Sequence, residues 1–363
     1  MRNVLILFAG FHLLLYSGLA QTRLMVDGRP SVMLSGSAAL MVIDLNGGSI
    51  VQFQLREQGL NPLRWANTGG AGEARPMSHF LCLDRWGQPS AAELKNGMPF
   101  HGEATRVRWE VVEAGAVSAR MKAKLPMAGL EVERVARMEP GSAAVLVTET
   151  VTNGNPLGRL YNMVQHPTIG PPFLDESTLV DSNAGKGFMQ SSPLPNPEEP
   201  SVQWPYALLD GKPVDMRRLQ SDPMPNVVSY VVDEQYGWAT AVHPARGLLI
   251  GYVWKSAEYP WFNAWRHVAD GKPLARGLEF GTTGLHQPFP VLVEKGRIFG
   301  RTLYEYLDAA QRETRGYVMF LAQTPAGYTG VARVEVSNGE LVIHGRDGGR
   351  IVVKAALLED WKP

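Results

Sequence analysis

The chain has 363 residues, a length typical of two average domains or of one large all-β unit. Lys plus Arg and Asp plus Glu both number 35, so the net charge is zero and no basic excess is available to neutralise a nucleic-acid backbone. Hydrophobic residues make up 45%, which allows a sizeable core and excludes a globally disordered chain. The single cysteine, Cys82, excludes an internal disulfide framework and a thiolate zinc cluster.

Residues 1–20 have the pattern of an export signal. Arg2 precedes an apolar run over residues 4–16, and Gly18 and Ala20 are spaced as in a signal peptidase site. A membrane anchor is the alternative, but the run is shorter than the ~20 residues that a spanning helix needs. We expect cleavage after Ala20, a secreted or periplasmic protein, and no membrane association of the cleaved chain.

From residue 21 onward, short strands and turns predict an all-β fold. A hairpin is expected within residues 37–53, around Asn46-Gly47-Gly48. Further β-rich runs follow at the spacing of a sandwich, at residues 106–113, 118–125, 130–138, 143–152 and 333–356. Only residues 302–311 have a helical pattern, so the helices that parallel βαβ units require are missing. We therefore predict a single large antiparallel β-sandwich domain over residues 21–363.

Residues 171–205 differ from the rest of the chain because they are rich in Ser, Pro and Asn and have few periodic apolar positions. Such a segment is either a linker between two domains or a long loop across one face of a sandwich. Strand patterns on both sides favour the loop.

The familiar phosphate, dinucleotide, metalloprotease and nucleophile-elbow motifs are absent. Three short segments instead contain groups that can move protons. His101 precedes a glycine at a strand entrance, His166 precedes a proline that favours extended backbone, and Glu279 lies within an apolar segment. Taken singly, both histidines fit a structural role and the carboxylate fits an outward position. If Glu279 points inward, burial raises its pKa and makes it a usable general base.

Aromatic residues are concentrated in residues 253–267. Core packing is the usual fate of tryptophan. An indole ring also suits the apolar C–H face of a pyranose, and interleaved polar side chains suit its hydroxyls. Both interpretations stay open, and Trp261 and Trp265 are the candidate sugar contacts.

Taken together, these segments resemble the galactose mutarotase-like superfamily, the aldose 1-epimerases and their relatives. Those proteins carry an arginine, a His-Gly element, an Asn-His element that ends a strand and a late Leu-Glu-Pro element. The chain has, in the same order, Arg85, His101-Gly102, Asn162 with His166, and Leu278-Glu279. The resemblance covers residues 37–354, and its specificity comes from the order of the motifs because each is short.

The resemblance implies a large antiparallel β-sandwich that binds a monosaccharide or sugar terminus and interconverts its anomers. Matched by position, Glu279 is the base, His166 the acid, and His101 a second histidine near the ring oxygen. Arg85 and Asn162 would bind the substrate. The family also uses an aspartate on the sugar hydroxyls, for which Asp222 is the nearest candidate, after a Pro-x-Asp-x-Arg element at residues 213–217.

Two departures reshape the implied pocket. The Asn-His pair is spread over five positions, and Leu-Glu-Pro-Gln is replaced by Leu-Glu-Phe-Gly at residues 278–281. The sugar is therefore not identified, and a non-catalytic carbohydrate-binding protein on the same fold is the alternative. A polysaccharide lyase or hydrolase is a third class. The reaction needs neither a metal nor a redox cofactor. The expected partner is a carbohydrate, with no nucleic acid, and the sequence defines no oligomeric state.

Overall fold

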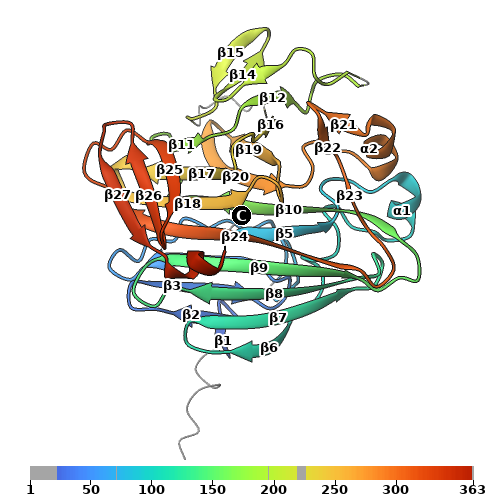
Figure 1. The fold of residues 1–363 in the computed structure, drawn as a ribbon, viewed down its shortest axis with the longest axis horizontal. Helices are drawn as coiled ribbons and strands as arrows, with labels where there is room; N and C mark the ends of the chain where they lie inside the picture. Colours follow the sequence, from blue (N-terminus) through green and yellow to red (C-terminus); the bar gives the residue numbers. More distant parts are fainter. Residues whose placement is uncertain (1–22, 71, 195, 219–225, 362–363) are drawn as a thin grey trace, which may run out of the picture.

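The computed structural model describes residues 23–70, 72–194, 196–218 and 226–361, and the predicted export signal lies outside them. Two large antiparallel sheets dominate the described residues (Figure 1). The prediction of an all-β antiparallel sandwich is confirmed. The assignment of residues 21–363 to one domain stays a prediction.

The larger sheet has twelve strands among the described residues. In spatial order they are β1 (Arg23–Val26), β2 (Arg29–Ser35), β3 (Ala39–Asp44), β4 (Ile50–Leu55), β5 (His79–Asp84), β10 (Arg159–Ile169), β20 (Lys272–Gly281), β19 (Trp261–Ala269), β16 (Val227–Val231), β12 (Lys186–Met189) and β13 (Val202–Gln203), with β23 (Glu305–Leu307) paired to β10.

The second sheet has eight strands in the described part of the chain. Their order is β11 (Leu179–Ser182), β17 (Tyr236–His243), β18 (Leu248–Lys255), β24 (Arg312–Gln323), β9 (Ala144–Asn153), β8 (Leu130–Met138), β7 (Ser118–Leu125) and β6 (Glu110–Ala114).

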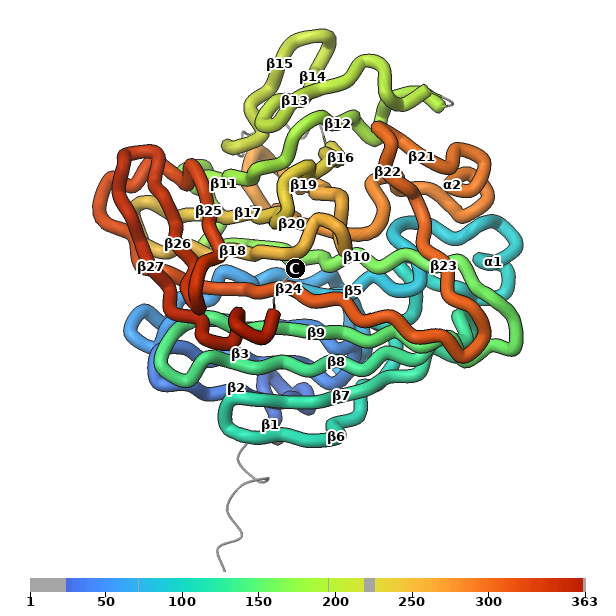
Figure 2. The backbone as a smooth tube through the Cα atoms, viewed as in Figure 1, coloured from blue at the N-terminus to red at the C-terminus, as the bar shows by residue number. Residues whose placement is uncertain are grey.

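Smaller elements surround the two sheets, and Figure 2 shows a three-stranded sheet beside them and a hairpin at the top of the view. These strands are β25 (Val331–Ser337), β26 (Glu340–Gly345) and β27 (Arg350–Lys354), the hairpin β14 (Tyr206–Leu209) and β15 (Lys212–Asp215), and the pair β21 (Arg297–Ile298) and β22 (Arg301–Thr302). The helical elements are α1 (Ala91–Lys95), α2 (Phe289–Lys295) and the 3₁₀ turns Pro244–Arg246 and Ala356–Asp360.

The main core forms between the two large sheets because their strands alternate apolar and polar side chains. On β8, Leu130, Val132, Ala136 and Met138 are buried together with Arg134, which pairs with Glu149, and the residues between these five positions are exposed or half-buried. This period of two places one face of each strand in the core. Strands β5 and β10 are buried on both faces, so a second layer of side chains covers the outer face of the large sheet.

Two expectations about local structure need correction. Residues 171–205 supply β11 to the second sheet and β12 and β13 to the large sheet, so this segment is more than a linker or a loop. Residues 302–311 contain β23 in place of a helix, because Glu305–Leu307 pairs with the edge of β10. None of the helices in the described residues is long and apolar enough to cross a membrane.

Candidate active site

The candidate site lies on the face of the large sheet that points away from the main core. On β10, Met163 belongs to the main core, whereas the next residue, Val164, packs in a separate cluster with Phe80. Successive side chains on a strand point to opposite faces, so His166 lies on the outer face with Val164. Its ring stacks on Phe80, with 4.1 Å between the ring centroids.

Strand register brings His166 and Glu279 together. Strands β10 and β20 are antiparallel neighbours in which Gln165 is opposite Phe280. The next pair in this register is His166 and Glu279, 113 residues apart in sequence. Nε2 of His166 lies 3.1 Å from Oε1 of Glu279. The sheet therefore joins the predicted acid and the predicted base.

These two side chains lie in a pocket of about 790 Å³. Five tryptophan or phenylalanine rings form much of its wall, and polar residues make up most of the rest. The lining residues are Trp65, Ala66, Asn67, Thr68, Pro76, Phe80, Trp86, Phe100, His101, Arg106, His166, Asn226, Val227, Trp265, His267, Leu274, Glu279 and His286. The order of the motifs predicted that His101, His166 and Glu279 share one pocket. All three line this pocket.

Hydrogen bonds fix the orientation of the His166–Glu279 pair. Nε1–H of Trp86 donates to Oε2 of Glu279 at 2.7 Å. Nδ1 of His166 lies 2.9 Å from the hydroxyl of Thr168, which also lies 3.4 Å from the carbonyl oxygen of His166. When this hydroxyl donates to the carbonyl, it accepts from Nδ1–H. Nε2 then presents a lone pair to Oε1 of Glu279.

Burial favours the neutral forms of both groups. Glu279 is 1% exposed and His166 is 5% exposed. Desolvation raises the pKa of Glu279 well above its usual range, an effect that the Trp86 hydrogen bond opposes. Desolvation likewise lowers the pKa of His166 to about 3. The pair therefore holds one proton between Oε1 and Nε2 at neutral pH.

His101 is held as a hydrogen-bond donor toward the pocket. The backbone N–H of Gly87 donates to its Nδ1 at 3.0 Å, so the proton of the neutral ring is on Nε2. Burial lowers the pKa of His101 well below its usual value, which keeps the ring neutral. The ring centroids of His101 and His166 are 5.6 Å apart.

Trp86 and His286 are among the pocket residues that no sequence motif predicted. The His286 ring lies 4.6 Å from that of Trp86 and 5.5 Å from that of His101. Burial lowers the pKa of His286 to about 4. The only sequence signal for Trp86 was its position next to Arg85, and His286 belonged to no motif.

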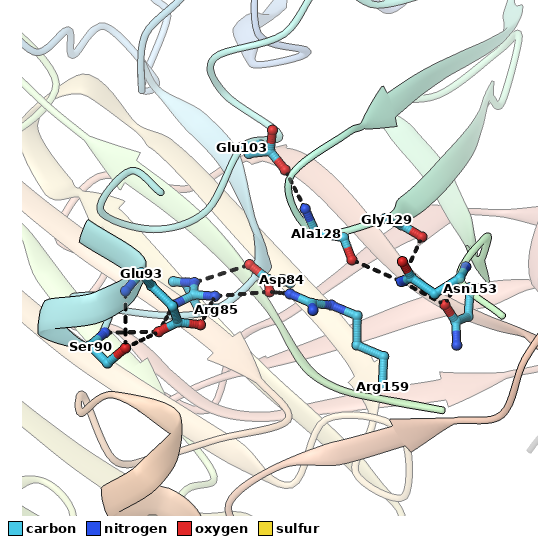
Figure 3. A network of polar contacts seen from close by, with 10 residues as sticks. Asp84, Arg85, Ser90, Glu93, Glu103, Ala128, Gly129, Asn153 and Arg159 are labelled. Carbon is cyan, nitrogen blue, oxygen red and sulfur yellow. Dashed lines mark hydrogen bonds and ion pairs between the residues drawn. The ribbon is translucent and has the colours of Figure 1, made fainter. Parts of the chain in front are cut away.

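Arg85 is not part of the lining of the pocket, and carboxylates surround its guanidinium. Its guanidinium hydrogen-bonds both carboxylate oxygens of Asp84 at 3.1 Å and those of Glu93 at 2.8 and 2.9 Å (Figure 3). Arg159 also pairs with Asp84, and Glu93 caps α1 through Ser90. Each of the three guanidinium nitrogens of Arg85 donates to a carboxylate. The residue predicted to bind sugar hydroxyls therefore anchors the segment that leads into Trp86 and the pocket.

Of the other predicted substrate contacts, Trp265 lines the pocket, whereas Asn162 and Trp261 do not. Trp265 is half-buried and lines the pocket. Asn162 does not line it, and its amide instead donates to the Leu303 carbonyl and accepts from the Thr282 hydroxyl. Trp261 is fully buried in a satellite apolar cluster away from the pocket. Asp222 lies outside the described residues.

Within the described ranges, no group of three or more His, Cys, Asp and Glu side chains has the arrangement of a metal site. The four histidines that line the pocket each contact an aromatic ring, and the His101 ring also contacts those of His166 and His286.

No protein-family model and no curated protein sequence matches the chain. Solved structures match it over most of its length. A galactose mutarotase related enzyme from Lactobacillus acidophilus has a TM-score of 0.60 at 12% identity, covering 82% of this chain and 99% of its own. Galactose mutarotase-like proteins from Lactobacillus casei and Clostridium acetobutylicum have TM-scores of 0.57 and 0.56 at 13% and 12% identity, covering 80% and 83% of this chain and 100% and 98% of theirs. The chain has the galactose mutarotase-like fold.

The galactose mutarotase-like fold agrees with the resemblance that the ordered motifs indicated. Identities of 12–13% define the architecture alone. What this galactose mutarotase-like chain does must be argued from the chemistry of its own pocket.

Proposed function

We propose that this protein interconverts the α and β anomers of a reducing sugar by general acid/base catalysis, the reaction of an aldose 1-epimerase. The observation that carries the proposal is the 3.1 Å contact between the Glu279 carboxyl and the His166 imidazole within an aromatic-walled pocket. An acid and a base at this separation suit a reaction in which one proton leaves an oxygen while another arrives at its neighbour.

The anomeric hydroxyl and the ring oxygen are bonded to the same carbon, C1, so one acid–base pair can reach both. As the base removes the hydroxyl proton, the O–H electron pair forms the C1=O bond. The bond between C1 and the ring oxygen breaks, its electrons stay on the ring oxygen, and the acid protonates that oxygen. Rotation about C1–C2 and closure on the other face give the second anomer.

The pair holds one proton before and after each half-reaction. With Glu279 as base and His166 as acid, ring opening leaves the carboxyl protonated and the imidazole neutral. Closure reverses both transfers and restores the starting state. Burial favours the neutral pair, which is the state reached after ring opening. The ionised state from which ring opening starts forms when one proton moves from Oε1 of Glu279 to Nε2 of His166 across their 3.1 Å contact.

Two further features support sugar binding. His101 is fixed with its proton on Nε2 and can donate to a sugar oxygen. The indoles of Trp65 and Trp265 are half-buried in the pocket wall, where they offer apolar faces to pyranose C–H groups.

The test follows anomer exchange by NMR or optical rotation, with purified protein and freshly dissolved α-glucose, α-galactose and related aldoses. We expect acceleration over buffer for at least one sugar. Glu279→Gln should abolish it, because an amide cannot accept the proton. Glu335→Gln, on β25 outside the pocket, is the matched control and should retain the rate. Absence of acceleration across the panel would refute the proposal.

Non-catalytic sugar binding is the second candidate, because the aromatic lining suits recognition without turnover. It predicts that sugars quench tryptophan fluorescence in both the parent protein and Glu279→Gln, while neither accelerates mutarotation.

We also propose that the protein acts outside the cytoplasm, on the basis of the signal pattern in residues 1–20. Expression of the full chain followed by N-terminal sequencing of the exported form should give Gln21 as the first residue. Retention of Met1 on a cytoplasmic product would contradict this.

A further inference from the structure

We infer that the substrate is a linear oligosaccharide whose reducing end enters the pocket and whose following units lie in a second hollow on the same sheet face. This inference rests on the proposed function and adds the substrate class. The second hollow has a volume of about 890 Å³ and shares Trp65 and Ala66 with the pocket.

The pocket alone is larger than one sugar requires. A hexose has twelve non-hydrogen atoms, and even the ~30 Å³ that each water takes in the liquid would give it only about 360 Å³. The pocket encloses about 790 Å³, and the adjoining hollow about 890 Å³. A single monosaccharide would fill less than half of the first space and none of the second.

The two hollows lie on one continuous surface. The second hollow is built on β2, β3 and β4, which precede β5 and β10 in the order of the large sheet. On β4, Phe53 and Leu55 point into the main core, so Gln52 and Gln54 point to the outer face. This is the face that carries His166. From β3 to β20 the surface extends over four strand spacings, about 19 Å.

The chemistry of the second hollow suits hydroxyl groups. Gln52 and Gln54 are half-buried and hydrogen-bonded to each other at 2.6 Å, which pre-orders two amides and leaves further donors and acceptors open. Behind them, Arg29 and Asp44 form a buried ion pair at 2.9 Å, so this part of the floor carries no unbalanced charge. Asp27, Arg64 and Arg75 also line this hollow, so both signs of charge lie around the two amides. Amides and charged groups together offer the donors and acceptors that sugar hydroxyls need.

Trp65 lies where the two hollows meet, so a sugar chain that occupies both has to pass its ring. Its ring is half-buried, lies edge-on to Trp265 at 5.8 Å and belongs to the lining of both hollows. Only the reducing end has a free anomeric carbon, so that end must be at Glu279. The next units then pass Trp65 toward β4.

The experiment compares each monosaccharide with its oligomers by NMR exchange of the anomeric protons. The probes are glucose against cellobiose and cellotriose, glucose against maltose and maltotriose, and galactose against β-1,4-galactobiose. We expect kcat/KM for one series to rise about tenfold or more on adding the second and third units. Equal or falling kcat/KM in every series overturns the inference while leaving the proposed function intact.

Substitutions inside and outside the second hollow test where the additional sugar units bind. Gln54→Ala should lower the ratio of trisaccharide to monosaccharide kcat/KM about three- to tenfold, as expected for a lost hydrogen bond. Gln323→Ala, an exposed glutamine that lines neither hollow, is the control and should keep the ratio. An unchanged ratio in Gln54→Ala counts against the second hollow.

If no sugar is turned over, the proposed function fails and calorimetric titration with the same sugars still decides the inference. Tighter binding of the trisaccharide than of its monosaccharide supports the second hollow. Equal binding, or none, refutes it.

Discussion

At the scale of single residues, environment converts ordinary side chains into a proton-transfer pair. Glu279 and His166 have no unusual sequence neighbours, yet both are almost fully buried and each has a hydrogen-bond partner beyond the other. Trp86 is the partner that acts on the carboxyl, because its N–H stabilises the charged form that burial disfavours.

Trp86→Phe should therefore lower kcat/KM about 10- to 100-fold, because a hydrogen bond to a charged carboxylate is worth ~1.5–3 kcal/mol. It should also move the pH at which the carboxyl titrates upward in the rate profile. The measurement is anomer exchange across a pH series. Trp261→Phe removes the same N–H from a buried indole outside the pocket, where it bonds to the Thr302 carbonyl, and should leave the rate profile in place.

At the scale of elements, two consecutive residues after β5 orient both halves of the site. Trp86 bonds to Glu279, and the Gly87 N–H bonds to His101. Arg85 anchors this segment through its ion pairs with the carboxylates of Asp84 and Glu93. The turn that carries His101 docks on the end of β5, where Gly102 lies against Leu83. The loop conformation is thus tied to the strand.

Gly102→Ala should disrupt the docking of the His101 turn on β5 and abolish activity. A Cβ at Gly102 would lie 2.2 Å from the Leu83 carbonyl oxygen, and φ is +77°. Gly211 has a similar φ of +74° with open space around it, so Gly211→Ala isolates the backbone cost of ~1–2 kcal/mol. Urea unfolding and exchange rates measure both. Equal losses of stability in the two variants would show that the close approach at Gly102 carries no extra cost.

At the scale of the whole molecule, a buried polar network joins the two sheets behind the pocket floor. Gln165 on β10 hydrogen-bonds Glu149 on β9 at 2.5 Å and contacts His79 at 3.2 Å. Glu149 in turn accepts from Arg134 at 2.6 Å. The network fixes β10, and with it His166, relative to the second sheet.

This network makes stability depend on pH. Burial first, and then the Arg134 charge, lower the pKa of His79 well below its usual value. Below about pH 6.5 the unfolded chain binds a proton at His79 that the folded protein does not, so stability falls as pH falls, by ~1.4 kcal/mol per pH unit. Glu279 acts in the opposite sense, because its raised pKa makes stability fall as pH rises above about 4.5.

His79→Gln retains a donor to Gln165 and removes the titration. Between pH 6 and 4.5 it should flatten the slope of unfolding free energy against pH by ~1.4 kcal/mol per unit in urea titrations. Gln323→Ala changes an exposed side chain that does not titrate, so it is the control and should keep the parent slope. Equal slopes of unfolding free energy against pH in the parent and in His79→Gln would contradict the assignment of this pH dependence to His79.

Strand periodicity, turn residues and the lack of helical patterns predict the fold class, because they leave few alternatives to an antiparallel sandwich. The sequence also selected His101, His166 and Glu279 through the order of short motifs, and the structure brings all three into one pocket. Each motif taken singly fits a structural role, so the selection depends on the order of the motifs along the chain and on the family that this order resembles.

Only the tertiary structure decided which other residues share the pocket. Trp86 and His286 meet across 200 positions, and their local sequence contains no trace of that approach. Arg85 and Trp86 are adjacent in the chain, yet one faces carboxylates outside the pocket lining and the other faces Glu279 within it. A side chain's partners depend on strand register and loop docking, which are set by the packing of segments far apart in the sequence.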